Sequence, residues 1–215
     1  MINLNLFASA SEQDAAYNGD AYIEPWVDYV RATGVVHYNK KYVVSADAVL
    51  KAKLVTYMDE LGLLENPSDG ITKEEAKSLK YIGNLFIDDQ TITSFDECQY
   101  FTNLRITDYS TSSRGFFSGS SLKSIVLPEG LDYVYYRSFK DCTKLETITI
   151  PVSVKYINYY AFQGCTSLTD VYYGGTVSDW RTNMSNGQYY DGWSDMDTSN
   201  ITVHCSDGDT TVFGA

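Results

Sequence analysis

The chain has 215 residues, of which 44% are hydrophobic and 20% are charged. This balance is typical of a folded protein and excludes a chain that is disordered throughout. The formal net charge is −12 at pH 7, so phosphate backbones repel the chain, and nucleic acid is not an expected partner. No stretch approaches the roughly 18 consecutive apolar residues of a membrane-spanning helix, so membrane insertion is not expected either.

Residues 1–44 carry no repeat and are predicted to form an extended N-terminal arm. Small and polar residues fill positions 8–20, a composition typical of extended segments. No signal peptide is visible, because the apolar stretch at positions 4–8 is short and follows no basic residue. The segments Tyr22 to Trp26 and His37 to Lys40 resemble N-terminal regions of proteins from gut Bacteroidetes and their phages. That resemblance implies an anchoring arm; the alternative is a further piece of an N-terminal cap.

Residues 45–84 are predicted to form a helical capping segment. Thr72 and Glu75 fit a capping box, which predicts a second helix from there to Lys80. A stack of repeats leaves apolar surface open at its ends, so this helical pair is expected to cover the first end. The first helix is expected to bury the apolar residues that recur at spacings of three and four, namely Val49, Leu50, Leu54, Tyr57, Met58 and Leu61.

The turn between these helices is similar to an EF-hand or dockerin-like calcium loop. With Gly70 at position six, Glu65 and Asp69 stand at positions one and five. Positions three and twelve hold Pro67 and Ala76, so two of these four oxygen ligands are missing, including the bidentate one. No metal is therefore expected.

Residues 85–175 contain a repeat of 23 residues, the spacing between Leu122, Leu145 and Leu168. Since no single unit could bury its apolar side alone, stacked units are expected to form a continuous core. Phe116 lies 23 residues before Phe139 and is expected to continue its column, whereas the first repeat is predicted to be truncated or distorted. Further columns at the same spacing are Ile125/Ile148/Val171, Leu127/Ile150/Tyr173, Pro128/Pro151, Leu131/Val154, Val134/Ile157, Phe139/Phe162 and Cys142/Cys165.

The repeat resembles the BspA-type leucine-rich repeats. The resemblance rests on the 23-residue period together with Ile150-Pro151 and the Phe-x-x-Cys-x-x-Leu steps that begin at Phe139 and Phe162. It implies a parallel solenoid, so the expected fold class is α+β: a short leucine-rich-repeat β-solenoid, to which the flanking residues add a helical N-terminal cap and a β-rich C-terminal cap. It also implies a surface or virion protein that adheres to host proteins, glycans or cells.

The four cysteines are Cys98, Cys142, Cys165 and Cys205. An even count allows disulfides, but Cys142 and Cys165 occupy equivalent positions of successive repeats. We expect them to be small buried hydrophobic residues rather than a disulfide or metal ligands.

Residues 176–215 are predicted to close the other end as a β-rich C-terminal cap, with a strand from Ile201 to Cys205. His204 and Cys205 form a loose polar cluster with Asp207 and Asp209. No second Cys or His lies at ligand spacing, so zinc is not expected.

Tyrosine is unusually frequent, with 19 residues. Two pairs at the repeat spacing are predicted to stack outside the apolar columns, and their neighbours extend the cluster. Exposed aromatic patches often mark interaction sites; the alternative is that the rings only shield the edge of the repeats. The candidate binding residues are Tyr133, Tyr135, Tyr136, Tyr156, Tyr159 and Tyr160.

No catalytic constellation is recognisable, so neither enzyme activity nor a cofactor is expected. The two histidines, His37 and His204, are far apart, and no nucleophile elbow or phosphate-binding loop is present. The first functional hypothesis is a phage virion protein (tail, fibre or capsid decoration) that recognises a host surface or other virion subunits, with a homo-oligomer compatible with that role. The alternatives are a bacterial cell-surface adhesin for host protein or glycan, and a cytoplasmic scaffold.

Overall fold

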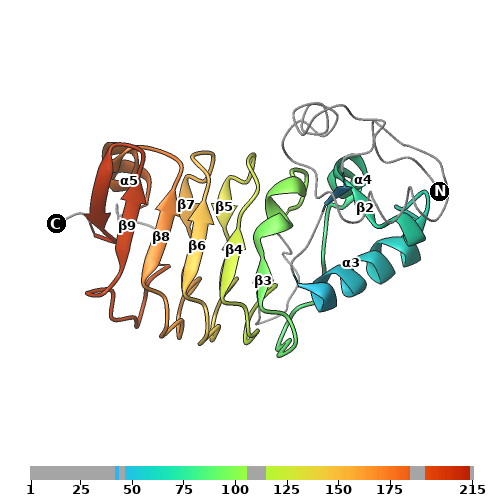
Figure 1. Ribbon diagram of the computed structural model, residues 1–215. Helices are drawn as coiled ribbons and strands as arrows, with labels where there is room; N and C mark the ends of the chain where they lie inside the picture. The colour runs from blue at the N-terminus through green and yellow to red at the C-terminus, as the bar shows by residue number, and fades with distance from the viewer. Residues whose placement is uncertain (1–41, 44–46, 106–114, 185–191, 214–215) are drawn as a thin grey trace, which may run out of the picture.

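The computed structural model describes residues 42–43, 47–105, 115–184 and 192–213 (Figure 1). Helices lie at both ends of the described chain, and the strands of the repeats lie side by side between them. The elements are, in chain order, β1 (Tyr42–Val43), α3 (Ala48–Glu60), η2 (Pro67–Asp69), β2 (Ile71–Thr72), α4 (Lys73–Ser78), β3 (Ser94–Phe95), η3 (Asp96–Tyr100), β4 (Ser124–Val126), β5 (Tyr133–Val134), β6 (Thr147–Ile150), β7 (Tyr156–Ile157), β8 (Asp170–Tyr173), α5 (Val177–Asn183), β9 (Thr202–Cys205) and β10 (Gly208–Thr211).

Helix α3 begins after Asp47, whose carboxylate accepts hydrogen bonds from the backbone amides of Val49 and Leu50. This is a side-chain N-cap, which satisfies amides that have no partner within the helix. The buried stripe is narrower than the sequence predicted, because Val49 and Leu61 are 42% and 51% exposed. The stripe consists of residues four apart: Leu50, Leu54 and Met58.

Helix α4 begins with the predicted capping box. Thr72 Oγ1 accepts from the Glu75 amide at 3.1 Å, and Glu75 Oε2 accepts from the Thr72 amide at 2.8 Å. The helix ends at Ser78, two residues before the predicted end, because Leu79 turns to an extended conformation and is buried. Strand β2 immediately before α4 pairs with β1 in antiparallel fashion. Apart from β1, the arm predicted for residues 1–44 lies outside the described residues.

Two carboxylates join α3 to the first repeat. The Oδ2 atom of Asp47 accepts from the amide and the hydroxyl of Thr93 at 2.6 and 2.9 Å. Lys53 of α3 donates to Asp89, whose side chain is almost fully buried. Polar contacts from the N-cap and from the second turn of α3 therefore tie the helical segment to the repeats.

Six strands form one sheet in the order β10-β9-β8-β6-β4-β3, in which all neighbours are parallel except the terminal pair β9 and β10. Ile125 lies opposite Ile148, Ile148 opposite Val171, and Val171 opposite Val203. All four are buried. The predicted 23-residue columns are confirmed in this sheet, where each inward residue packs on its equivalent in the next repeat.

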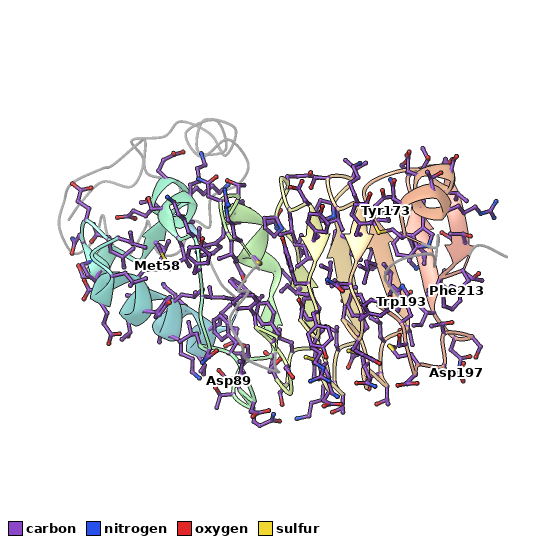
Figure 2. All side chains as sticks on the ribbon, turned by 180° about the vertical axis from the view of Figure 1, so that it is seen from behind. Met58, Asp89, Tyr173, Trp193, Asp197 and Phe213 are labelled. Atoms are coloured by element: carbon purple, nitrogen blue, oxygen red, sulfur yellow. The ribbon has the colours of Figure 1, made fainter. Side chains whose placement is uncertain are left out.

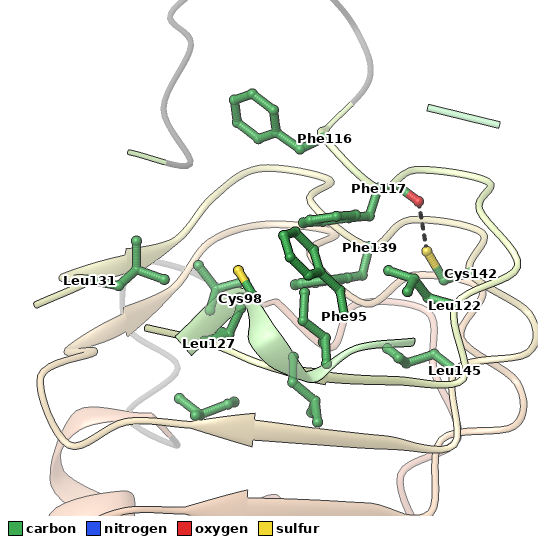
Figure 3. Close-up of a cluster of buried hydrophobic side chains, with 14 of the residues drawn as sticks. Phe95, Cys98, Phe116, Phe117, Leu122, Leu127, Leu131, Phe139, Cys142 and Leu145 are labelled. Atoms are coloured by element: carbon green, nitrogen blue, oxygen red, sulfur yellow. Dashed lines mark hydrogen bonds between the residues drawn. The ribbon is translucent and has the colours of Figure 1, made fainter. Parts of the chain in front are cut away.

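A stack of aromatic rings runs through the core of the repeats. Successive centroids lie 5.7, 5.3, 5.4 and 4.6 Å apart, and the first three pairs are parallel within 9°. The prediction that Phe116 continues the column of Phe139 is wrong. Its neighbour Phe117 occupies the column, and Phe116 lies apart from the stack (Figure 3). The stack consists of Phe86, Phe117, Phe139, Phe162 and Trp193.

The ring register shifts because one turn is a residue shorter than the others. Phe117 precedes Leu122 by five residues, whereas Phe139 precedes Leu145 by six. The 23-residue spacing therefore holds for the leucines and fails for the rings. Hydrogen bonds confirm the shifted alignment, since the Phe117 amide donates to Ser138 and the Phe139 amide donates to Ala161.

The first repeat is complete rather than truncated. Phe86, Asp89, Ile92 and Phe95 have the same spacing as Phe162, Cys165, Leu168 and Val171. Phe95 lies opposite Ile125, 30 residues later, so the irregularity is extra chain between the first two repeats. Asp89 takes the position that Cys142 and Cys165 have in later repeats.

Each repeat makes the same left-handed turn two residues after its ring. The φ angles are 54°, 73°, 61°, 79° and 61° at Asp88, Gly119, Asp141, Gly164 and Asp195. Aspartate and glycine tolerate this conformation better than most residues. The column alternates between them because each glycine lies against the preceding aspartate. A Cβ atom on Gly164 would lie 2.5 Å from Asp141 Oδ1, and one on Gly119 would overlap Asp88.

We expect Gly164→Ala to lower the free energy of unfolding by about 1–3 kcal/mol, since it adds left-handed strain and a clash. Urea unfolding followed by circular dichroism measures the change. The matched control is Gly62→Ala, where φ is 67° but no atom lies within 4 Å of the added Cβ. Equal losses in the two variants would show that the contact with Asp141 contributes nothing.

Cys142 and Cys165 are buried free thiols, as expected. The Cys142 thiol donates to the Phe117 carbonyl at 2.9 Å (Figure 3), and the Cys165 thiol donates to the Phe139 carbonyl at 3.0 Å. Each thiol therefore satisfies a carbonyl of the preceding repeat. The other two cysteines are also free.

The C-terminal end combines a helix with the β9–β10 hairpin. Strand β9 begins within one residue of the predicted strand, whereas α5 was not predicted. Thr176 and Asp179 form the capping box of α5, with aspartate in the position usually held by glutamate or glutamine. Trp180 of α5 is buried and donates from Nε1 to the Val212 carbonyl at 3.0 Å. Seen from behind, Trp193 lies within this end and Phe213 at its margin (Figure 2).

Candidate binding surface

The two short strands β5 and β7 place their tyrosines outward. Tyr133 lies opposite Tyr156, and Val134 lies opposite Ile157. Side chains alternate along a strand, so Val134 and Ile157 are buried while the two tyrosines are 37% and 44% exposed. The rings of Tyr133 and Tyr156 stack at 5.3 Å with an interplanar angle of 17°.

A second group of rings surrounds Arg137. Its guanidinium carbon lies 4.7 Å from the centroid of Tyr136 and 5.8 Å from that of Tyr160. The two rings meet edge to face at 6.0 Å. Arg137 and Tyr160 are equivalent residues of successive repeats and share a left-handed conformation, with φ of 56° and 57°. This repeated turn brings the arginine against both rings, a cation–π arrangement that restrains them.

The six candidate tyrosines form two groups of touching rings on the same two repeats. Tyr135 lies 5.6 Å from Tyr133, and Tyr159 lies 6.3 Å from Tyr160. Tyr133, Tyr136, Tyr156 and Tyr159 are exposed, whereas Tyr135 and Tyr160 are half-buried. We call these six residues with Arg137 the tyrosine surface. The sequence pattern did not predict that Arg137 belongs to this surface. Its place in the repeat could have indicated it, because Arg137 is equivalent to Tyr160, two residues before the core ring.

A separate cluster lies on the outer face of the large sheet. The Tyr172 ring, 46% exposed, stacks on His204 at 4.8 Å. His204 Nδ1 lies 3.0 Å from Asp209 Oδ1, and Nε2 lies 2.8 Å from Asp170 Oδ1. The sequence pointed to Asp209 but missed Asp170, which comes 34 residues earlier on β8. The hydrogen bond to Asp170 is the main cause that raises the pKa of His204 above its ordinary value of 6.5.

The remaining predicted polar groups are not brought together as a ligand set. Among the described residues, no three histidine, cysteine or acidic side chains are placed to hold a metal ion. Asp207 instead accepts a hydrogen bond from the Val177 amide. No helix among the described residues has the length and apolar character needed to cross a membrane.

Comparison with known proteins places the repeats in a family. No curated protein matches the chain significantly. Among solved structures, the chain is similar to a leucine rich cell surface protein from Faecalibacterium prausnitzii A2-165, with 30% identity and a TM-score of 0.28. The match covers 43% of this chain and 20% of that protein. Residues 78–189 match the BspA type leucine rich repeat region in six copies. The chain therefore belongs to the BspA-type leucine-rich-repeat family.

Proposed function

We propose that this chain is a non-enzymatic binding module whose repeats form a short solenoid and whose tyrosine surface contacts a protein on a cell surface. The observation that carries the proposal is the exposure of Tyr133, Tyr136, Tyr156 and Tyr159 on neighbouring repeats. Tyrosine and arginine dominate the strongest contacts of protein interfaces. The family supports the proposal, since stacked repeats offer extended surfaces suited to recognition.

The geometry of the rings favours a protein partner over a glycan. Tyr133 and Tyr156 cover one another's faces, and Arg137 lies over the face of Tyr136. A sugar ring stacks on an open aromatic face, and each of these contacts covers one face of a ring and leaves fewer faces on which a sugar could stack. Edges and hydroxyl groups suit the mixed apolar and hydrogen-bonding contacts of protein interfaces. Because neighbouring rings already restrain one another, less side-chain entropy is lost on binding.

The setting that we propose is a bacterial cell surface, with a virion as the less supported alternative. The virion hypothesis drew on residues 1–44, of which the structure describes only Tyr42 and Val43. The binding hypothesis draws on the repeats, which the structure describes. Antibody labelling of intact source cells and of particles purified from the same culture distinguishes the two settings.

The binding role is tested with the fluorescently labelled full chain on cultured epithelial cells. We expect saturable binding that is lost when the cells are treated with protease and retained after periodate oxidation of their glycans. Tyr156→Ser is expected to weaken the apparent affinity at least tenfold, the effect of losing an interface hot spot.

The matched control is Tyr81→Ser. Tyr81 is 50% exposed but lies outside the tyrosine surface, and its variant is expected to bind within about twofold of the unchanged chain. Loss of binding after periodate alone would identify a glycan as the partner. Equal binding by the Tyr156 and Tyr81 variants would remove the tyrosine surface from the binding role.

A further inference from the structure

His204 occupies the junction of three strands at the C-terminal end of the sheet. It lies on β9, opposite Tyr172 of β8 on one side and Asp209 of β10 on the other. Its two ring nitrogens point to carboxylates on different strands: Nε2 to Asp170 of β8 and Nδ1 to Asp209 of β10. One imidazole therefore connects the last parallel strand of the repeats with both strands of the terminal hairpin.

The arrangement requires a proton on each ring nitrogen. A carboxylate can only accept hydrogen bonds, and a neutral imidazole has one N–H donor and one lone pair. In either neutral tautomer, one carboxylate would face the lone pair of the ring. In the imidazolium form, both nitrogens donate and the positive charge lies between two negative charges. The contacts at 2.8 and 3.0 Å are thus both satisfied only when His204 is protonated.

We infer that His204 is a proton-dependent latch that holds the β9–β10 hairpin on the repeats and loosens it when the proton is lost. The latch is independent of the tyrosine surface and of what that surface binds. It acts on a hairpin that also places Val203 in the core and, beyond β10, Val212 against Trp180. Loss of the proton is therefore expected to favour local opening rather than global unfolding.

The groups that face the imidazole account for the direction of its pH dependence. Asp170 and Tyr172 face it from β8, and Asp209 faces it from β10. The hydrogen bond to Asp170 is the largest influence and raises the pKa of His204; partial burial comes second and opposes it, and Asp209 raises the pKa further. In return, the hydrogen bond from His204 lowers the pKa of Asp170 below its ordinary value of 3.8.

The sign of the effect follows from these two shifts. A histidine whose folded-state pKa is raised contributes its full stabilisation below about 6.5 and loses it as the pH rises through the raised pKa. Asp170 contributes its stabilisation of the folded state above about pH 3.8 and loses it as the pH falls through its lowered pKa. The latch is therefore closed in weakly acidic solution and opens as the pH rises through the pKa of His204, which lies above 6.5.

The test is hydrogen exchange of the full chain between pH 5.5 and 8.5, with rates corrected for intrinsic exchange. The amides of β9 and β10 are compared with those of β6 as an internal reference. The opening constant of the hairpin relative to β6 is expected to rise about threefold to fivefold over this range, as for exposed ion pairs. His204→Gln should abolish this rise, and Asp209→Asn should reduce it.

An NMR titration gives the second readout, because the chain contains only two histidines and His204→Gln assigns them. The His204 imidazole is expected to titrate above 6.5 and to titrate lower in Asp209→Asn. Glu129→Gln, which removes an exposed carboxylate from another turn, should leave both readouts unchanged. A His204 pKa at or below 6.5, or an equal pH course for the hairpin and β6, would overturn the latch.

Discussion

Phe139→Ala is expected to lower the free energy of unfolding by about 3–5 kcal/mol, the range for removing a buried phenylalanine. Phe139 is completely buried and lies between two parallel rings, 5.3 Å from Phe117 and 5.4 Å from Phe162. The variant loses both ring contacts and leaves a cavity in the middle of the stack. Neighbouring repeats stabilise one another mainly through such shared interfaces. We therefore also expect a broader urea transition, because the two halves of the array become less coupled.

Phe116→Ala is the matched control for the ring register. Phe116 is also largely buried, at 8% exposure, but stands outside the stack. Phe116→Ala is expected to lower the free energy of unfolding by about half as much as Phe139→Ala, since it removes fewer contacts and leaves a smaller cavity. If Phe116→Ala destabilised the protein as much as Phe139→Ala, the assignment of Phe117 to the column would be wrong.

Asp47→Ala is expected to cost about 2–4 kcal/mol, which is large for a single polar side chain. The N-cap of α3 contributes about 1 kcal/mol. The remainder arises because the amide and hydroxyl of Thr93 lose a charged acceptor, the buried carboxylate of Asp47. The same change should free α3 from the first repeat, so trypsin should cleave at Lys51 and Lys53 faster than in the unchanged protein. Thermal unfolding and the rate of appearance of these fragments measure the two effects.

Asp59→Ala controls for removing a carboxylate from α3 without removing the bridge. Asp59 is exposed near the end of the helix, and its variant should change stability by less than about 0.5 kcal/mol. Burial raises the pKa of Asp47, but hydrogen bonds from Leu50 and Thr93 outweigh it and lower the pKa below 3.8. The difference in the free energy of unfolding between the unchanged protein and Asp47→Ala should therefore be full above pH 4. It should shrink as the pH falls through the lowered pKa of Asp47. A difference that persisted unchanged at pH 2 would contradict the bridge.

The sequence revealed those features that depend on residues at fixed spacing. Columns such as Ile125, Ile148 and Val171 could be predicted because a parallel sheet repeats the same inward position in every unit. The Thr72–Glu75 capping box could be predicted because both partners lie within one helical turn. The outward placement of Tyr133 and Tyr156 followed from the alternation of side chains along a strand.

Features that depend on small changes in chain length were missed. A single residue lost between Phe117 and Leu122 moved the ring column without disturbing the leucine column. Additional chain between the first two repeats concealed the equivalence of Phe86 with later rings. Asp89 concealed it further, because it replaces a thiol with a carboxylate that Lys53 and Thr91 partner.

The polar cluster at His204 shows the limit for contacts between distant residues. Asp209 was visible because it is close in the chain, across the hairpin turn. Asp170 was not, because nothing local indicates that β9 lies beside β8 rather than beside another strand. Helix α5 was missed for a different reason: its capping residue Asp179 is shorter than the usual glutamate and gives a weaker pattern.

The reversal of direction at β10 has a consequence for assembly. Strands β3, β4, β6, β8 and β9 all run the same way, so any of them could serve as a template for one more strand of the same polarity. β10 runs against them and carries the charged Asp209 on the last strand of the sheet. A second copy approaching head to tail therefore meets a short, charged edge strand instead of another strand of the parallel array, and short, charged edges resist edge-to-edge pairing. The hairpin thus gives this end of the sheet an edge that disfavours the addition of further strands in line with the repeats.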